Sequence, residues 1–208
     1  MTQTTLDLRH RYERIAPLYD LLDIPFEYGC YRRLRPLLFQ GLSGRILDAG
    51  VGTGRNMPFY PPGSDVVGVD LSPAMLRHAE HRRTLSPASV KLMEMNVTRL
   101  EFPDASFDAA VATFLFCTLP DELQVSALRE LERVVKPKGT IRLLEYTRPH
   151  RGIRRVVTKL WEPWVHWAYG ASFDRRTEQH IPDAGLTLIG ARFVVDDLIR
   201  LIEAKPRA

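Results

Sequence analysis

The sequence lacks several features that mark common classes of protein. Its 208 residues include only two cysteines, Cys30 and Cys117, which lie far apart and match no metal-ligand spacing, so we expect free thiols in a reducing compartment. His78 and His81 have no third ligand nearby, so no metal site is expected. No stretch reaches the ~18 apolar residues of a membrane span, and the N-terminus lacks the apolar segment of a signal peptide. We therefore expect a protein that is soluble or bound only to a membrane surface.

The common nucleotide-binding motifs are also missing, although a glycine loop is present. Asp48–Asn56 reads DAGVGTGRN. A dinucleotide fingerprint, G-x-G-x-x-G, fails because Arg55 or Met57 stands at its last position, and no Gly-Lys-Ser/Thr of a P-loop follows. A carboxylate just ahead of the loop suits a cationic ligand. Asp70, twenty positions after Gly50, ends the next apolar run and can accept the hydroxyls of a ribose.

Apolar runs alternate with segments of helical spacing along one domain. The runs expected to form strands are 45–50, 65–71, 89–96, 107–116, 139–146, 186–195 and 199–204. This order predicts an α/β fold with a parallel sheet, helices on both faces, and ligands at the carboxyl ends of the strands. We divide the domain into N-terminal helices facing membrane or substrate, a cofactor-binding core, an insert, and closing strands, at residues 1–40, 45–147, 148–182 and 183–208. Three prolines at 17, 25 and 36 are expected to break the N-terminal helix into short pieces.

The segments LDAGVGTG, VVGVDLSPAML, FPDASFD and ELERVVKPKGT, in this order, resemble the class I S-adenosylmethionine-dependent methyltransferases. The resemblance implies a Rossmann-like, seven-stranded sheet whose last strand is antiparallel, with N-terminal helices and a helical insert between strands five and six. It implies S-adenosylmethionine as cofactor and S-adenosylhomocysteine as product. The cofactor-binding residues that it implies are Asp48, Gly50, Gly52, Gly54, Asn56, Asp70, Leu71, Met75, Asn96, Val97, Phe114 and Tyr19. Asn96 departs from the Asp of many relatives, but its side-chain oxygen can also accept a hydrogen bond from adenine.

The segment between the fifth and sixth strands combines arginine with tryptophan. Residues 148–176 carry seven basic and two acidic residues, a local charge of 7 − 2 = +5, and all three tryptophans lie at 161, 164 and 167. This composition suggests a polyanionic partner, either lipid headgroups or nucleic acid. The sequence Thr113-Phe114-Leu115-Phe116 stands where nucleic-acid methyltransferases carry an Asn/Asp-Pro-Pro-Tyr/Phe motif, so nucleic acid is the weaker expectation. The tryptophans suit the headgroup zone of a bilayer, with core packing as the alternative.

The acceptor site is expected where aromatic and acidic side chains meet. The expected walls of an ammonium site are Tyr146, Tyr19 and Tyr28, because aromatic faces attract cations. His150 or Glu145 is expected to accept the proton. The residues expected to bind substrate are Tyr28, Glu27, Arg148 and Arg151.

The opening RYERIAPLYDLL, with GVGTGRN and YPPGSDVVGVDLSPAML, is similar to bacterial phospholipid N-methyltransferases. This implies stepwise N-methylation of phosphatidylethanolamine toward phosphatidylcholine, at the anionic inner face of the cell membrane, by a cytoplasmic, peripheral enzyme with no required protein partner. Methylation of a quinone or another lipophilic small molecule is the alternative. A lipid-sensing protein without catalytic activity is a third reading, and nucleic-acid binding a fourth.

Overall fold

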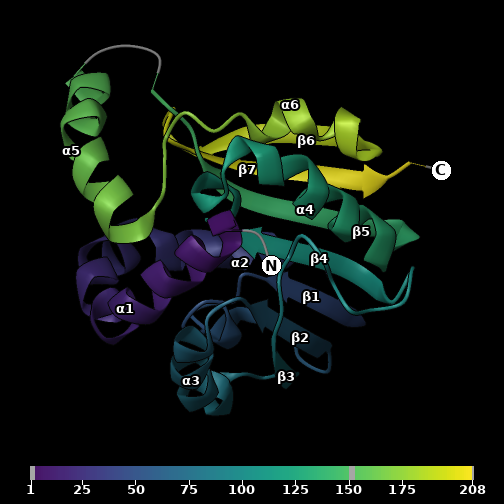
Figure 1. The fold of residues 1–208 in the computed structure, drawn as a ribbon. Helices are drawn as coiled ribbons and strands as arrows, with labels where there is room; N and C mark the ends of the chain where they lie inside the picture. Colours follow the sequence, from purple (N-terminus) through teal and green to yellow (C-terminus); the bar gives the residue numbers. More distant parts are fainter. Residues whose placement is uncertain (1–2, 150–152, 208) are drawn as a thin grey trace.

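The computed structural model describes residues 3–149 and 153–207, and it has the predicted seven-stranded α/β sheet (Figure 1). The sheet order is β3-β2-β1-β4-β5-β7-β6. The strands are β1 Arg45–Ala49, β2 Asp65–Asp70, β3 Ser89–Glu94, β4 Phe107–Thr113, β5 Val135–Tyr146, β6 Leu186–Val195 and β7 Ile199–Pro206. β1 to β5 pair in parallel, whereas β7 runs antiparallel to both β5 and β6. The expected antiparallel last strand is therefore confirmed.

Helices cover both faces because neighbouring strand residues point to opposite sides. Leu47 packs in the cluster that contains the buried face of α4, whereas Ile46 packs with residues of α2 and α3. These helices are α2 Arg32–Phe39, α3 Pro73–Arg82, α4 Asp121–Val134 and the short α6 Thr177–His180, which contacts α4. Each face of the sheet thus has its own apolar core.

The N-terminal helix is longer than expected. α1 runs unbroken over Gln3–Phe26 and includes both Pro17 and Pro25, so the prediction of short pieces is wrong. A single π-helical turn, Glu27–Tyr31, then joins α1 to α2, which contains Pro36. All three prolines are exposed, so the backbone carbonyls that lose a helical partner there can be hydrated.

The insert between β5 and β6 contains the helix α5, Ile153–Tyr169, which stands beside α1 at one end of the sheet (Figure 1). At the same end β4 finishes at Thr113, and the chain turns through Phe114 with a positive φ of 54°. Non-glycine residues rarely adopt this conformation, which is commonest at functional sites. No helix among the described residues is both long and apolar enough to cross a bilayer.

Candidate functional site

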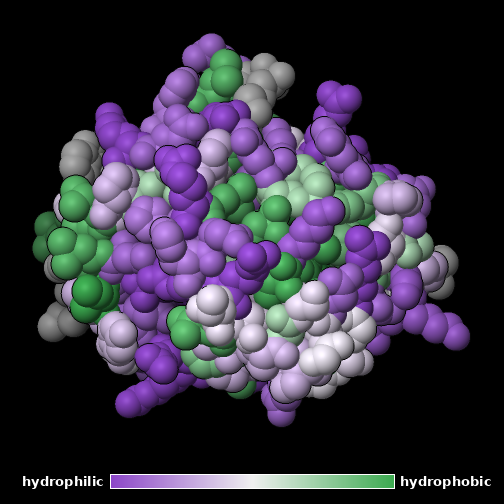
Figure 2. Space-filling model, turned by 90° about the horizontal axis from the view of Figure 1, so that it is seen from below, coloured by the Kyte–Doolittle hydropathy of each residue, from purple (hydrophilic) through white to green (hydrophobic). Residues whose placement is uncertain are grey.

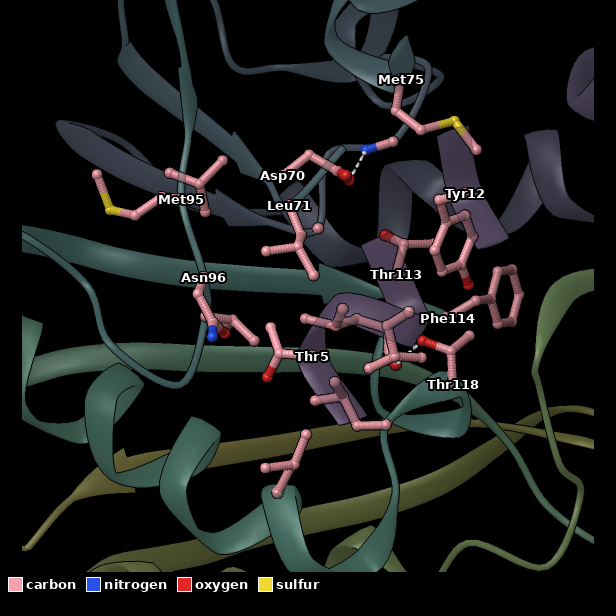
Figure 3. A pocket seen from close by; sticks show the side chains of 18 of the residues that line it. Thr5, Tyr12, Asp70, Leu71, Met75, Met95, Asn96, Thr113, Phe114 and Thr118 are labelled. Atoms are coloured by element: carbon pink, nitrogen blue, oxygen red, sulfur yellow. Dashed lines mark hydrogen bonds between the residues drawn. The ribbon is translucent and has the colours of Figure 1, made fainter. Parts of the chain in front are cut away.

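One cavity lies where the chain leaves β1, β2, β3 and β4, and α1 forms its wall (Figure 3). We call it the glycine-loop cavity; its volume is about 100 Å³. Asn96 and Met95 lie at one end, and Tyr12 and Phe114 lie at the other. Nine of the residues expected to bind cofactor line it: Gly50, Gly52, Asp70, Leu71, Met75, Asn96, Val97, Phe114 and Tyr19. The sheet edge thus brings together most of the predicted set.

The loop itself is shaped by glycine and tied to Asp70. Gly50 has a φ of +71°, which strains any other residue, and a Cβ there would lie 2.8 Å from the Leu115 Cδ1 atom and push that side chain aside. The Asp70 carboxylate accepts hydrogen bonds from the backbone N–H groups of Gly52 and Ser72, both at 2.9 Å. Burial raises the pKa of Asp70 to about 6, although these N–H groups oppose the rise. Asp70 is therefore fixed at the cavity wall and ionised above that pH.

Asn96 contributes to the opposite end of the cavity. Its Oδ1 atom accepts hydrogen bonds from the backbone N–H and the hydroxyl of Thr98, both at 2.9 Å. These bonds hold the turn after β3 and fix the direction of the amide.

Three of the expected cofactor residues lie outside the glycine-loop cavity. Asp48 is fully buried beneath the loop, where it accepts hydrogen bonds from the Tyr60 hydroxyl at 2.6 Å and the Asn56 Nδ2 atom at 3.0 Å. Asn56 lines a smaller adjoining cavity. A Cβ on Gly54 would lie 3.0 Å from the Ala79 Cα atom, so this glycine allows α3 to pack closely on the loop. Asp48 therefore lies where it supports the loop from beneath and does not line the glycine-loop cavity.

Glu27 and Tyr28, which were expected to bind substrate, do not line the glycine-loop cavity. Glu27 is buried and accepts three hydrogen bonds from Arg35, the shortest at 2.7 Å. Arg35 also donates to the Asn56 Oδ1 atom at 2.8 Å, so this ion pair supports the glycine loop from below. Tyr28 is 65% exposed and lies under the guanidinium of Arg32 on the surface.

A second cavity, of about 360 Å³, adjoins the first. We call it the aromatic cavity because eight rings line it: Tyr12, Tyr19, Phe26, Tyr31, Phe114, Tyr146, Tyr169 and Phe173. Tyr12, Tyr19, Phe114 and Thr118 line both cavities. The structure therefore places a mainly apolar chamber directly beside the glycine loop.

The rings of the aromatic cavity hold one another in place. Phe114 stacks on Tyr146 with ring centroids 4.7 Å apart, and it also lies 4.7 Å from the ring of Tyr31. The hydroxyl groups of Tyr31 and Tyr146 are in contact. Burial raises the pKa of Tyr146 and of Tyr19 well above the usual value, so both stay protonated at neutral pH. Tyr19 and Tyr146 reach the expected chamber, and Tyr31 occupies the place that was expected for Tyr28.

Asp23 is the one carboxyl group among the described residues that line the aromatic cavity. It is 7% exposed, and its Oδ2 atom lies 3.3 Å from the Arg55 Nε atom. Burial raises the pKa of Asp23 to about 6, and the positive charges of Arg55 and Arg35 limit the rise. The sequence analysis missed Asp23. The spacing of four residues from Tyr19 could have indicated Asp23, because it puts both side chains on one face of α1.

Glu145, one of the two residues expected to accept the proton, is buried and does not line the aromatic cavity. Its carboxylate accepts hydrogen bonds from the backbone N–H groups of Phe116 and Cys117, each at 2.9 Å. Burial raises its pKa to about 7. Glu145 thus supports the turn after β4. His150 and Arg151 lie outside the described residues, and Arg148 lines a separate cavity near the end of β5.

Of the three tryptophans, only Trp164 has a described side chain. It is half-buried and meets Tyr169 edge to face, with centroids 5.6 Å apart. Trp164 and Tyr169 belong to a small apolar cluster around Phe173 and Val165. Trp164 therefore agrees better with the core-packing alternative than with the role of a wholly exposed membrane anchor.

The known proteins to which this chain is similar are described as methyltransferases. The family described as "Methyltransferase domain" matches residues 46–139. A demethylmenaquinone methyltransferase of Thermus thermophilus is 34% identical over 157 residues, 72% of this chain and 70% of that one. A phosphatidylethanolamine N-methyltransferase of Cereibacter sphaeroides is 34% identical over 119 residues, 56% and 57% of the two chains. The fold is similar to that of a Thermotoga maritima protein described as a SAM-dependent methyltransferase and possible histamine N-methyltransferase, with a TM-score of 0.72, 19% identity, and coverage of 96% and 100%.

Proposed function

The chain belongs to the class I S-adenosylmethionine-dependent methyltransferases, and we propose that it methylates a lipophilic acceptor drawn from a membrane surface. The observation that carries this proposal is the aromatic cavity itself. A chamber of about 360 Å³ adjoins the glycine-loop cavity, and the described residues contribute eight rings and a single carboxyl group to its lining. Such a lining favours an apolar acceptor with one polar end.

The glycine-loop cavity fits the methyl donor. Asp70 keeps unused lone pairs that could accept the ribose hydroxyls, and Gly50, with a φ of +71°, has no side chain to stand between the loop backbone and the donor. Leu71, Met75 and Val97 supply apolar contacts for the adenine. When bound, S-adenosylmethionine supplies a methyl group already activated on a sulfonium. The protein then has to orient the acceptor and exclude water.

Asp23 is placed to take the proton that the acceptor loses. Each transfer forms one bond from the methyl carbon to the acceptor and breaks the carbon–sulfur bond, and one proton leaves the acceptor. With a pKa of about 6, Asp23 is ionised at neutral pH and can receive that proton. Tyr19 and Tyr31 line the cavity together with Asp23, and their rings can hold the acceptor against it.

An exposed apolar stripe on α1 supports docking on a bilayer. Leu18, Leu21 and Ile24 are 55%, 63% and 44% exposed, and their spacing puts them on one side of α1; Tyr28, in the π-helical turn that follows, is 65% exposed. Arg14 lies just before this stripe, and Arg32 and Arg33 lie just after it; all three are exposed. Near an anionic membrane surface, each arginine would strengthen binding by roughly 1 kcal/mol. In Figure 2 hydrophobic side chains gather at the left edge, where Figure 1 places α1 and α5.

The same helix joins this surface to the aromatic cavity. Pro25 and Phe26, next to the stripe, line the cavity, as do Tyr19 and Asp23. A lipid held by α1 at the bilayer therefore has a short path to the chamber. This supports an anionic membrane surface as partner and a location at the face of a membrane.

We propose a demethylated quinol as the first acceptor and phosphatidylethanolamine as the second. The quinol is favoured by the similarity to the demethylmenaquinone methyltransferase, which extends over 72% of the chain, and by flat aromatic walls that suit a ring. The amine is favoured by the shorter similarity to the phosphatidylethanolamine N-methyltransferase. A buried carboxylate among aromatic rings also suits an ammonium group.

Vesicles can separate the two acceptors. The purified protein is incubated with S-adenosylmethionine and vesicles that contain either demethylmenaquinol or phosphatidylethanolamine, and the lipids are weighed by mass spectrometry. Methylation of the quinol alone supports the first acceptor, and stepwise methylation of the amine supports the second. If the protein binds the donor but neither lipid gains a methyl group, the proposed acceptor class is wrong.

A further inference from the structure

A third cavity, of about 610 Å³, lies on the other side of the rings of Tyr146 and Phe173, which it shares with the aromatic cavity. We call it the arginine cavity. Five arginines line it, against three carboxyl groups: Arg148, Arg155, Arg175, Arg176 and Arg200, with Glu145, Asp174 and Glu178. The chemistry described above does not use this concentration of guanidinium groups.

The printed sequence separates these arginines widely, and the fold brings them together. Arg148 follows β5, Arg175 and Arg176 precede α6, and Arg200 lies on β7, which pairs with β5. Glu145 pairs with Arg200 in this register. The end of the sheet therefore forms a cationic wall from three segments.

Carboxylates hold three of these guanidinium groups in place but leave many of their donors unused. Arg148 Nη2 lies 2.7 Å from Glu162 Oε1, Arg175 Nη1 lies 3.1 Å from Asp121 Oδ1, and Arg200 Nη1 lies 2.6 Å from Glu178 Oε1. Each guanidinium has five N–H donors. These ion pairs therefore orient the groups without satisfying them.

Two of the unused donors are buried. The Nε atoms of Arg175 and Arg200 are shielded from solvent and have no hydrogen-bond partner in the described part of the chain. A guanidinium group that keeps unpaired donors favours a ligand with acceptor oxygens over an apolar one.

The neighbouring groups are consistent with a positive field. The Asp174 pKa is lowered, first by a hydrogen bond from Ser172 and further by the charges of Arg148 and Arg175. Arg176 is exposed, and its guanidinium forms no ion pair with any described residue. Arg176 is therefore available to a bound anion.

We propose that the arginine cavity binds a phosphate group next to the acceptor chamber. Planar guanidinium groups match the tetrahedral oxygens of phosphate in paired hydrogen bonds. Because Tyr146 and Phe173 separate the two cavities, a phosphate here would lie beside the acceptor. The phosphate can come from a phospholipid headgroup or from free phosphate. This inference deepens the proposed function and rests on it.

Binding is tested by calorimetry on the full chain with three probes at equal ionic strength: sodium phosphate, dihexanoyl phosphatidylethanolamine and sodium chloride. Arg176→Gln removes a cation that has no ion-pair partner among the described residues, and Arg77→Gln on the exposed face of α3 is the matched control. We expect phosphate or the phospholipid to bind the wild type, with affinity at least tenfold weaker in Arg176→Gln and unchanged in Arg77→Gln. Binding by the phospholipid alone would assign the site to a headgroup, and binding by both to phosphate in general.

The inference is overturned if neither phosphate probe binds, or if the two variants weaken binding equally. A second readout separates this failure from that of the proposed function. Methylation of a short-chain quinol, which has no phosphate, is expected to be equal in wild type and Arg176→Gln. If the wild type methylates the quinol but binds no phosphate, only the inference fails. If it methylates no lipophilic acceptor, the proposed function fails, and with it the inference.

Discussion

Replacing Asp23 by Asn tests the reaction and the electrostatics of the site together. The substitution keeps the shape of the side chain and removes its charge. Burial raises the pKa of Asp23 from 3.8 to about 6, a shift of roughly 2 units, or about 3 kcal/mol. Because the folded-state pKa is raised, this group's contribution to stability is complete below about pH 4 and is lost as the pH rises through 6.

The expected result combines lower activity with higher stability. We compare the unfolding free energy of Asp23→Asn with that of the wild type at two pH values. This difference is expected to favour the variant by up to about 3 kcal/mol more at pH 8 than at pH 4. Arg55 keeps a partner, since its Nη2 atom lies 3.2 Å from Asp20 Oδ1. Methyl transfer is expected to fall roughly 10²- to 10⁴-fold, as for loss of a general base.

The assays are urea unfolding at the two pH values and the initial rate of methyl transfer to vesicle lipid. Asp7→Asn, at an exposed position on the same helix, is the matched control and should leave both unchanged. A variant with lower stability at pH 8 and normal activity would refute the reasoning, because Asp23 would then be only a structural partner of Arg55.

Three further predictions concern the donor, the membrane and the loop support. Asp70→Ala should weaken binding of S-adenosylhomocysteine at least tenfold, measured by calorimetry. The affinity of the wild type should decline as the pH falls through about 6, where Asp70 becomes protonated. Unchanged affinity in both experiments would contradict the role assigned to Asp70. Replacing Leu18, Leu21 and Ile24 together by Ser should reduce co-sedimentation with anionic vesicles without lowering the melting temperature, since all three are exposed; full retention would show that another surface docks. Glu27→Gln should cost about 3–5 kcal/mol of stability by leaving Arg35 buried and unpaired, measured by urea unfolding; a raised KM at normal stability would instead favour the substrate role first expected for Glu27.

The sequence predicted the sheet and the cofactor side of the site well, because both depend on local signals. Apolar runs ending in Asp70 or in the glycine loop report directly on buried strands and the turns after them. β6 was expected at 186–195, and its bounds agree with that expectation. Seven of the expected cofactor residues lie at or just after the ends of β1 to β4 and meet at one edge of the sheet because parallel strands end together, whereas Tyr19 comes from α1 and Met75 from α3.

The acceptor side was harder to predict because it depends on how each helix is rotated about its axis, which decides the side chains that face the chamber. The π-helical turn at Glu27–Tyr31 changes the rotation per residue between α1 and α2. Tyr31 therefore faces the chamber and Tyr28 faces solvent, and no local pattern reveals that exchange. The same turn lets Glu27 meet Arg35, a contact across eight positions that also depends on tertiary packing.

The central claim is that a methyl group passes from the donor at the glycine loop to a lipophilic acceptor in the aromatic cavity. Its most direct test is a single turnover of the purified protein, loaded with S-adenosylmethionine labelled on the methyl carbon and mixed with bacterial membrane vesicles, followed by partition into organic and aqueous phases. The account predicts that the label moves into a lipid of the organic phase, and that Asp70→Ala abolishes this transfer. Label that stays on the donor, or that appears only in a water-soluble product, would contradict it.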